Sequence, residues 1–129
     1  MARIKNVLLV DDNEIDNLIN ERIISSSGFA SDVKVRNSVD GALAYLREIA
    51  GNTELTPEFV FLDLNMPVRD GFSFLEEYST LPDTITSKAR IIVVSSSMST
   101  EDINKASSNP YVLKYINKPL SEKYLEAIF

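Results

Sequence analysis

Short apolar runs alternate with amphipathic segments along the chain. Four consecutive apolar residues occur at 7–10, 59–62 and 91–94, a pattern typical of strands that are buried on both faces. Residues 33–36 alternate apolar and basic side chains, which favours a half-exposed strand at the edge of a sheet. Residues 111–116 complete the pattern as a fifth strand.

The segments between and after these strands predict five helices, in which apolar residues recur at helical spacing. Residues able to cap a helix precede or open four of them: Asp12 or Asn13, Asn37 or Ser38, Thr100 and Ser121. The apolar positions of the five helices are, in order, Ile15, Leu18, Ile19 and Ile23; Val39, Ala42, Leu43, Leu46 and Ile49; Phe72, Leu75 and Tyr78; Ile103 and Ala106; and Tyr124, Leu125 and Ile128. The turn-forming stretch 81–84 is expected to close the third helix.

A strand followed by a helix, about five times over, predicts an α/β fold: a parallel sheet with helices on both faces and right-handed crossovers. The dinucleotide-binding fold and the flavodoxin-like fold both fit this pattern. The acidic stretch 11–14 follows the first strand, and the chain has only 4 glycines, so a pyrophosphate could not approach the backbone there. We therefore predict a flavodoxin-like, doubly wound, five-stranded parallel sheet with strand order 2-1-3-4-5.

Composition narrows the class of protein and of partner. The chain has 129 residues, of which 44% are apolar and 25% charged, so we expect one globular domain over residues 1–129. The net charge of −6 repels nucleic acid and anionic membranes, and favours basic or cationic partners. The absence of cysteine and histidine excludes disulfides, the usual zinc sites and Ser-His triads. Without a segment long enough for a signal peptide or membrane span, we expect a cytoplasmic protein.

Polar side chains follow four of the five predicted strands. Asp11 and Asp12 come after the first strand, Asp63 after the third, Ser95 after the fourth and Lys118 just past the fifth. Because the carboxyl ends of parallel strands meet at one edge of a sheet, we expect these side chains to lie close together. Neighbouring carboxylates repel one another unless a cation joins them, and hard oxygen ligands suit Mg²⁺.

Each of these residues, taken singly, has a simpler explanation. Asp11 and Asp12 could cap the first helix, and Asp63 could form a turn before Pro67. A serine after a strand is usually a solvated loop residue, and Lys118 before a proline is most often a surface lysine. Only their combination at the ends of alternate buried strands favours a site.

These residues resemble the receiver domain of two-component response regulators, over essentially the whole chain. The acidic pair, Asp63 within the motif 63–71, Ser95 and Lys118 with its following proline match the family pattern in order and approximate spacing. The resemblance implies that Asp63 accepts a phosphoryl group from the phosphohistidine of a histidine kinase or histidine phosphotransfer protein, as an acyl phosphate. Lys118 and Ser95 would then contact phosphoryl oxygens.

The resemblance also implies a set of Mg²⁺ ligands, a conformational switch and residues that control how long the phosphoryl group stays on Asp63. Mg²⁺ would be held by Asp12, Asp63 and the backbone carbonyl of Asn65, with Asp11 acting more through water. Tyr115 would enter the space that Ser95 vacates and so change the surface of the last two helices, which would bind a downstream protein target. Slow autodephosphorylation would be tuned by Asn65 and Ser97. We expect a monomer or a phosphorylation-dependent dimer.

Other function classes fit less well. A phosphatase of the haloacid-dehalogenase type has a second acid two residues after its nucleophile, where this chain has Asn65. A receiver-like module that is never phosphorylated has no need of Asp11, Asp12 and Lys118. Neither acidic loop has the glycine and terminal glutamate of an EF-hand. We therefore expect a phosphoacceptor signalling domain and not a conventional enzyme.

Overall fold

The computed structural model describes residues 4–66 and 68–128, so Pro67 of the motif 63–71 lies outside the described residues. The strands are β1 (Ile4–Val10), β2 (Ala30–Arg36), β3 (Phe59–Leu62), β4 (Arg90–Ser95) and β5 (Val112–Asn117). The helices are α1 (Glu14–Ser26), α2 (Val39–Glu48), α3 (Gly71–Tyr78), α4 (Asp83–Thr86), α5 (Thr100–Ser107) and α6 (Glu122–Ile128). None of these helices is long and apolar enough to cross a membrane.

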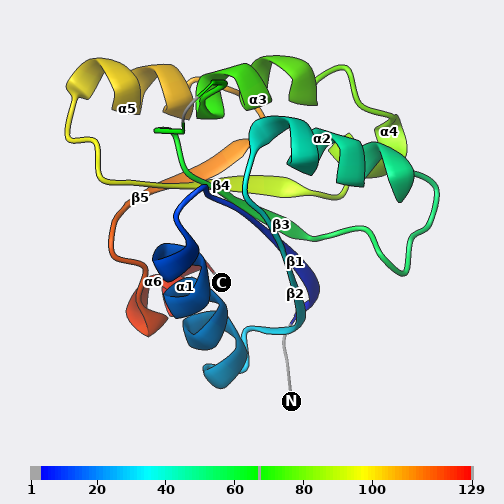
Figure 1. Cartoon of the computed structure of the whole chain (residues 1–129), viewed down its shortest axis with the longest axis horizontal. Helices are drawn as coiled ribbons and strands as arrows, with labels where there is room; N and C mark the ends of the chain where they lie inside the picture. The colour runs from blue at the N-terminus through cyan, green and yellow to red at the C-terminus, as the bar shows by residue number, and fades with distance from the viewer. Residues whose placement is uncertain (1–3, 67, 129) are drawn as a thin grey trace.

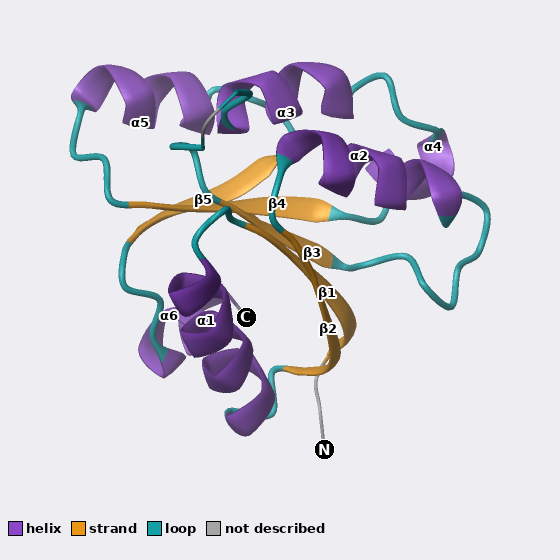
Figure 2. Ribbon diagram, viewed as in Figure 1, coloured by secondary structure: helices purple, strands orange, loops and turns teal. Residues whose placement is uncertain are grey.

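The strands form one parallel sheet in the order β2-β1-β3-β4-β5, which confirms the predicted flavodoxin-like topology. Helices α1 and α6 cover one face, and the other helices cover the opposite face (Figures 1 and 2). In the pairing of β1 with β3, Val10 is level with Leu62. The residues that follow these two strands, Asp11 and Asp63, are therefore neighbours at the carboxyl end of the sheet.

Each face of the sheet has its own apolar core, because successive strand residues point to opposite faces. Beneath α2 and α3 the strands contribute Leu8, Val10, Val60, Leu62, Ile91 and Val93. Toward α1 and α6 they contribute Ile4, Val7, Leu9, Phe61, Ile92, Val94 and Ile116. Burial on both faces explains why the central strands read as unbroken apolar runs.

The predicted apolar face is buried in α2 but not in α1. All five predicted positions of α2 are buried, but Ile15, Leu18 and Ile19 of α1 are 69%, 54% and 47% exposed. Helix α1 packs instead through Asn17 and Ile24, which are seven residues apart on one face. This orientation turns the apolar ridge of α1 outward.

Among the other helices, the apolar residues are buried to different degrees. Leu125 of α6 is buried, but Tyr124 is 41% exposed, so only part of the predicted inward face is correct. In α5, Ala106 is buried and Ile103 only partly so. Both helices are short, and a helix of two turns covers the sheet with one or two side chains.

Helix α4 is an element that the sequence pattern did not predict. The stretch 81–84, expected only to close α3, leads into a single helical turn that begins after Pro82. Its side chain Ile85 is completely buried. Propensity gives little sign of so short a helix, because its formation depends on tertiary packing.

Gly71 holds the start of α3 against the end of β3. Its N–H donates to the carbonyl of Leu64 at 2.9 Å, and Asp70 caps the helix by accepting from the N–H of Ser73 at 3.1 Å. A Cβ at Gly71 would lie 2.6 Å from the carbonyl oxygen of Asp63 and 2.8 Å from the Cα of Leu64. The glycine therefore lets α3 approach the backbone of the two residues that follow the strand.

We predict that Gly71→Ala lowers the free energy of unfolding by about 1–3 kcal/mol, because the backbone of Asp63 and Leu64 must shift to admit a methyl group. Urea denaturation followed by circular dichroism measures this change. Gly41→Ala in α2 is the matched control, since its Cβ would approach a side chain, the hydroxyl of Ser38 at 2.9 Å, and not the backbone of another element. Equal stability of Gly71→Ala and the wild-type chain would contradict the close packing.

Candidate functional site

Three carboxylates converge at the carboxyl end of the sheet, and we call Asp11, Asp12 and Asp63 the acidic group. One carboxylate oxygen of each lies within 4.8 Å of the others. Asp11 and Asp63 are each only 5% exposed, whereas Asp12 is exposed. The backbone N–H of Asp63 donates to the carbonyl of Val10 at 2.9 Å, which extends the pairing of β1 with β3 to the acidic group.

The position of Asp11 is fixed by residues at the start of α1. The N–H of Asn13 donates to Asp11 Oδ1 at 3.0 Å. The side-chain amide of Asn17, which is buried, donates to the backbone carbonyl of Asp11 at 2.7 Å. Asn13 also accepts from the N–H of Asp16 as the cap of the helix. The same few residues thus begin the helix and hold the carboxylate.

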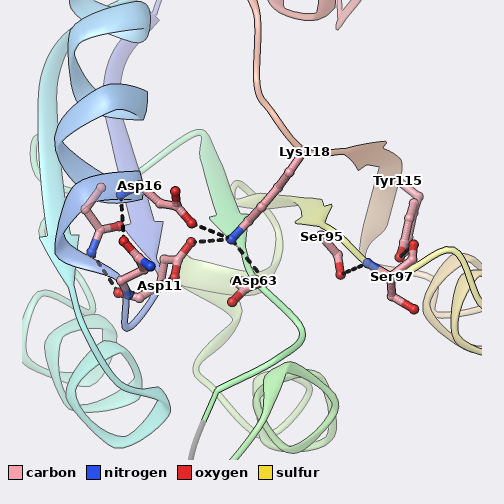
Figure 3. A network of polar contacts seen from close by, with 9 residues as sticks. Asp11, Asp16, Asp63, Ser95, Ser97, Tyr115 and Lys118 are labelled. Carbon is pink, nitrogen blue, oxygen red and sulfur yellow. Dashed lines mark hydrogen bonds and ion pairs between the residues drawn. The ribbon is translucent and has the colours of Figure 1, made fainter.

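Lys118 follows β5, and its side chain extends toward Asp11, Asp16 and Asp63 (Figure 3). Its Nζ lies 2.9 Å from Asp16 Oδ2, 3.0 Å from Asp11 Oδ2 and 3.6 Å from Asp63 Oδ1. Its backbone N–H donates to the carbonyl of Ser95 at 2.9 Å, which ties it to the end of β4. The structure therefore brings the predicted lysine and acids together.

Asp16 is a site residue that the sequence interpretation missed. It lies in the first turn of α1, where an acid is readily explained by the helix dipole alone. Its position could have been noticed, because side chains lean toward the N-terminal end of a helix. A helix whose cap, Asn13, directly follows Asp12 therefore aims its first-turn side chains toward the sheet end.

Burial and the neighbouring charges shift the pKa values of Asp63 and Lys118. Burial raises the pKa of Asp63 to about 6, the neighbouring charge of Asp11 adds to this rise, and Lys118 and a backbone hydrogen bond from Asn65 oppose it. Burial opposes the charge on Lys118, but hydrogen bonds to Asp16 and Asp11 outweigh it and raise the pKa of the ammonium. The lysine is firmly cationic, yet it does not fully offset the acids around it.

The acidic group suits a hard divalent cation. Asp63 Oδ1 is buried and makes no hydrogen bond within the described residues; its ion pair with Lys118, at 3.6 Å, is longer than a hydrogen bond. A buried carboxylate oxygen without a donor is costly unless a cation satisfies it. Mg²⁺ prefers oxygen ligands and keeps much of its water, which fits a site with an exposed acid beside two buried ones.

Ser95, Ser97 and Tyr115 form a second group of polar contacts (Figure 3). Ser95 is completely buried, and its hydroxyl accepts from the N–H of Ser97 at 3.1 Å. The hydroxyl of Tyr115 donates to the carbonyl of Ser97 at 2.9 Å, while the Ser97 hydroxyl donates to Asp102 at 2.9 Å. One residue, Ser97, therefore connects the buried serine, the tyrosine and the start of α5.

Comparisons with known proteins agree on one family. The family model "Response regulator receiver domain" matches residues 7–129. Response regulator Rcp1 from Synechocystis sp. (strain ATCC 27184 / PCC 6803 / Kazusa) is 28% identical over 123 residues, which are 94% of this chain and 81% of that protein.

Solved structures agree in fold as well as in sequence. The two component response regulator from Cytophaga hutchinsonii has a TM-score of 0.89 and 27% identity, covering 97% of this chain and 93% of that one. The response regulator receiver protein from Dyadobacter fermentans DSM 18053 has a TM-score of 0.82 and 29% identity, covering 97% and 98%. With the matched family model, these likenesses show that the chain belongs to the response regulator receiver domain family.

Proposed function

We propose that Asp63 accepts a phosphoryl group from a phosphohistidine on a histidine kinase or histidine phosphotransfer protein. The observation that carries the proposal is that Asp63 lies beside both the other two acids and Lys118. A carboxylate oxygen of Asp63 forms the new O–P bond while the P–N bond to the donor imidazole breaks and its electron pair returns to nitrogen. An ionised carboxylate needs no base to remove a proton, so positioning and charge stabilisation account for the transfer.

The remaining residues of the site neutralise the transferred group. Mg²⁺, when bound, would supply positive charge to the phosphoryl oxygens, held by Asp12, Asp63 and the carbonyl of Asn65, with Asp11 acting through water. Lys118 supplies a second positive charge. The hydroxyl of Ser95 donates a hydrogen bond to a third phosphoryl oxygen.

Phosphorylation would be read at the surface of α5 and α6 through Ser95. When Ser95 turns to the phosphoryl group, its hydroxyl gives up the N–H of Ser97, whose carbonyl holds Tyr115. The tyrosine then moves inward and changes the surface that a downstream protein target binds. Asn65 and Ser97 set the rate of autodephosphorylation. In this role the chain is a phosphoacceptor in the cytoplasm and not a conventional enzyme.

The exposed apolar ridge of α1 is the surface on which the phosphodonor docks. Ile15, Leu18 and Ile19 are exposed on the helix whose first turn reaches Lys118 through Asp16. A donor imidazole that reaches Asp63 must cover this rim, so its protein would bury the ridge. A groove beside Leu18 is lined also by Glu14 and Glu21, which favours a donor helix with apolar residues flanked by basic ones.

The first test is phosphorylation by a small acyl phosphate with Mg²⁺. We expect the wild-type chain to gain the mass of one phosphoryl group and Asp63→Asn to gain none. Lys118→Ala should slow the reaction about 10²-fold, because it removes one preorganised charge. Intact-protein mass spectrometry over time measures both. Glu76→Gln, an exposed acid of α3, is the control; equal labelling of Asp63→Asn would overturn the proposal.

The cost of the buried charge predicts a pH-dependent stability. In EDTA no metal ion offsets the charge of Asp63, whose pKa is raised to about 6, so ionising this carboxyl group in the folded chain costs free energy. The stability that the protonated carboxyl group contributes is full below the unfolded pKa and is lost as pH rises through about 6. The free energy of unfolding of Asp63→Asn should therefore exceed that of the wild type by roughly 2 kcal/mol near neutral pH, and the difference should vanish near pH 4.

Urea unfolding of both proteins across this pH range measures the difference. Added Mg²⁺ should stabilise the wild-type chain at neutral pH and leave Asp63→Asn nearly unchanged, because the variant lacks one of the three carboxylates. If Asp63→Asn is less stable than the wild type at neutral pH, the ionised carboxylate of Asp63 does not destabilise the folded chain.

The docking surface is tested by Leu18→Ser. We expect transfer from a phosphorylated histidine kinase that labels the wild-type chain to fall at least about tenfold, as for loss of an apolar anchor at an interface. Labelling by the small acyl phosphate should not change. Leu55→Ser is the matched control, since Leu55 is 40% exposed in the loop before β3, at the opposite end of the sheet. Equal loss in both variants would exclude a specific surface on α1.

A further inference from the structure

Asp16 is the acid that Lys118 contacts most closely, and it is not part of the acidic group. The distance from Nζ to Asp16 Oδ2 is 2.9 Å, against 3.0 Å to Asp11 and 3.6 Å to Asp63. The side chain of Asp16 is 36% exposed, whereas those of Asp11 and Asp63 are 7% and 5% exposed. Lys118 thus contacts, besides the two buried acids, a more exposed acid at the rim of the site, on the side of α1 (Figure 3).

Lys118 and a bound metal ion are two cations that use the same carboxylates. The ammonium already contacts Asp11 and Asp63, which the ion would also need. An ammonium has three donors, and without Asp16 the freed donor would turn to the two buried acids. Like charges that share ligands repel, so a lysine deeper in the acidic group would weaken metal binding.

We propose that Asp16 is a positioning residue that holds Lys118 at the α1 side of the site and so leaves Asp11 and Asp63 open to Mg²⁺. This inference rests on the proposed function, because it assigns the division of carboxylates between the metal and the lysine. Asp16 touches neither the metal nor the phosphoryl group. It acts through the position of the ammonium.

A simpler role for Asp16 is to place negative charge at the start of α1. Glu14 has the same role, since it is an exposed acid of the same first turn. No contact joins Glu14 to Lys118 among the residues that the structure describes. Glu14 also lines the groove of the proposed donor surface, but Mg²⁺ affinity is measured with no donor present. Glu14→Gln therefore removes a helix charge and a nearby negative charge without freeing the lysine, which makes it the matched control for Mg²⁺ binding.

The experiment measures Mg²⁺ affinity by isothermal titration calorimetry in the full chain. We expect Asp16→Asn to weaken Mg²⁺ binding roughly fivefold or more and Glu14→Gln to change it less than about twofold. Asp16→Glu should restore most of the affinity, because it keeps a carboxylate within reach of the ammonium. Asp16→Ser is a second variant that removes the charge, and thermal unfolding verifies that each variant is folded.

The decisive comparison repeats Asp16→Asn in a Lys118→Ala background. Lys118→Ala should bind Mg²⁺ more tightly than the wild type, and adding Asp16→Asn to it should have no more effect than Glu14→Gln. An equal loss in both backgrounds would show that Asp16 is only a nearby charge, and would overturn the inference. Unchanged Mg²⁺ affinity in Asp16→Asn would also overturn the inference. If Asp63 is still phosphorylated in that case, the proposed function stands on its own. Absence of Mg²⁺ binding by the wild-type chain would overturn both.

Discussion

Repulsion between buried carboxylates at the ends of β1 and β3 is the constraint on which the site depends. The sheet forces it, because the pairing that puts Val10 level with Leu62 leaves Asp11 and Asp63 side by side. Asn17 holds the backbone of Asp11, and the N–H of Asp63 is held by the carbonyl of Val10. The fold thus maintains an arrangement of acids that one lysine only partly neutralises. The remaining negative charge is the feature on which the proposed binding of Mg²⁺ rests.

Much of the fold could be predicted because the signals were redundant. Apolar runs that end in polar residues marked the central strands, and the lack of a glycine-rich turn after the first strand separated two similar topologies. The convergence of Asp11, Asp63 and Lys118 followed from parallel strands alone, without knowledge of any contact. Their separate roles in phosphoryl transfer and metal binding remain predictions, because the arrangement brings the groups together without showing the reaction.

What could not be predicted depends on tertiary contacts that leave no periodic signal. The apolar spacing in α1 indicated a buried face, but the amide of Asn17 and the packing of Ile24 set the rotation of the helix. The role of Gly71 was hidden because it depends on how closely α3 approaches β3. Asp16 was concealed by its ordinary place in a first turn. Such features arise from rotations of whole elements, which residue types alone do not encode.

Three consecutive residues of α1 connect the surface to the chemistry. Successive helical residues point about 100° apart, so Leu18 faces solvent, Asn17 faces the sheet and Asp16 leans toward the sheet end. Asn17 fixes Asp11, and Asp16 contacts Lys118, so a small rotation of this one turn would move both charges. A partner that buries Leu18 would therefore contact the helical turn that positions two of the charges beside Asp63. The proposed docking on α1 would for this reason be coupled through one helical turn to the charges around Asp63.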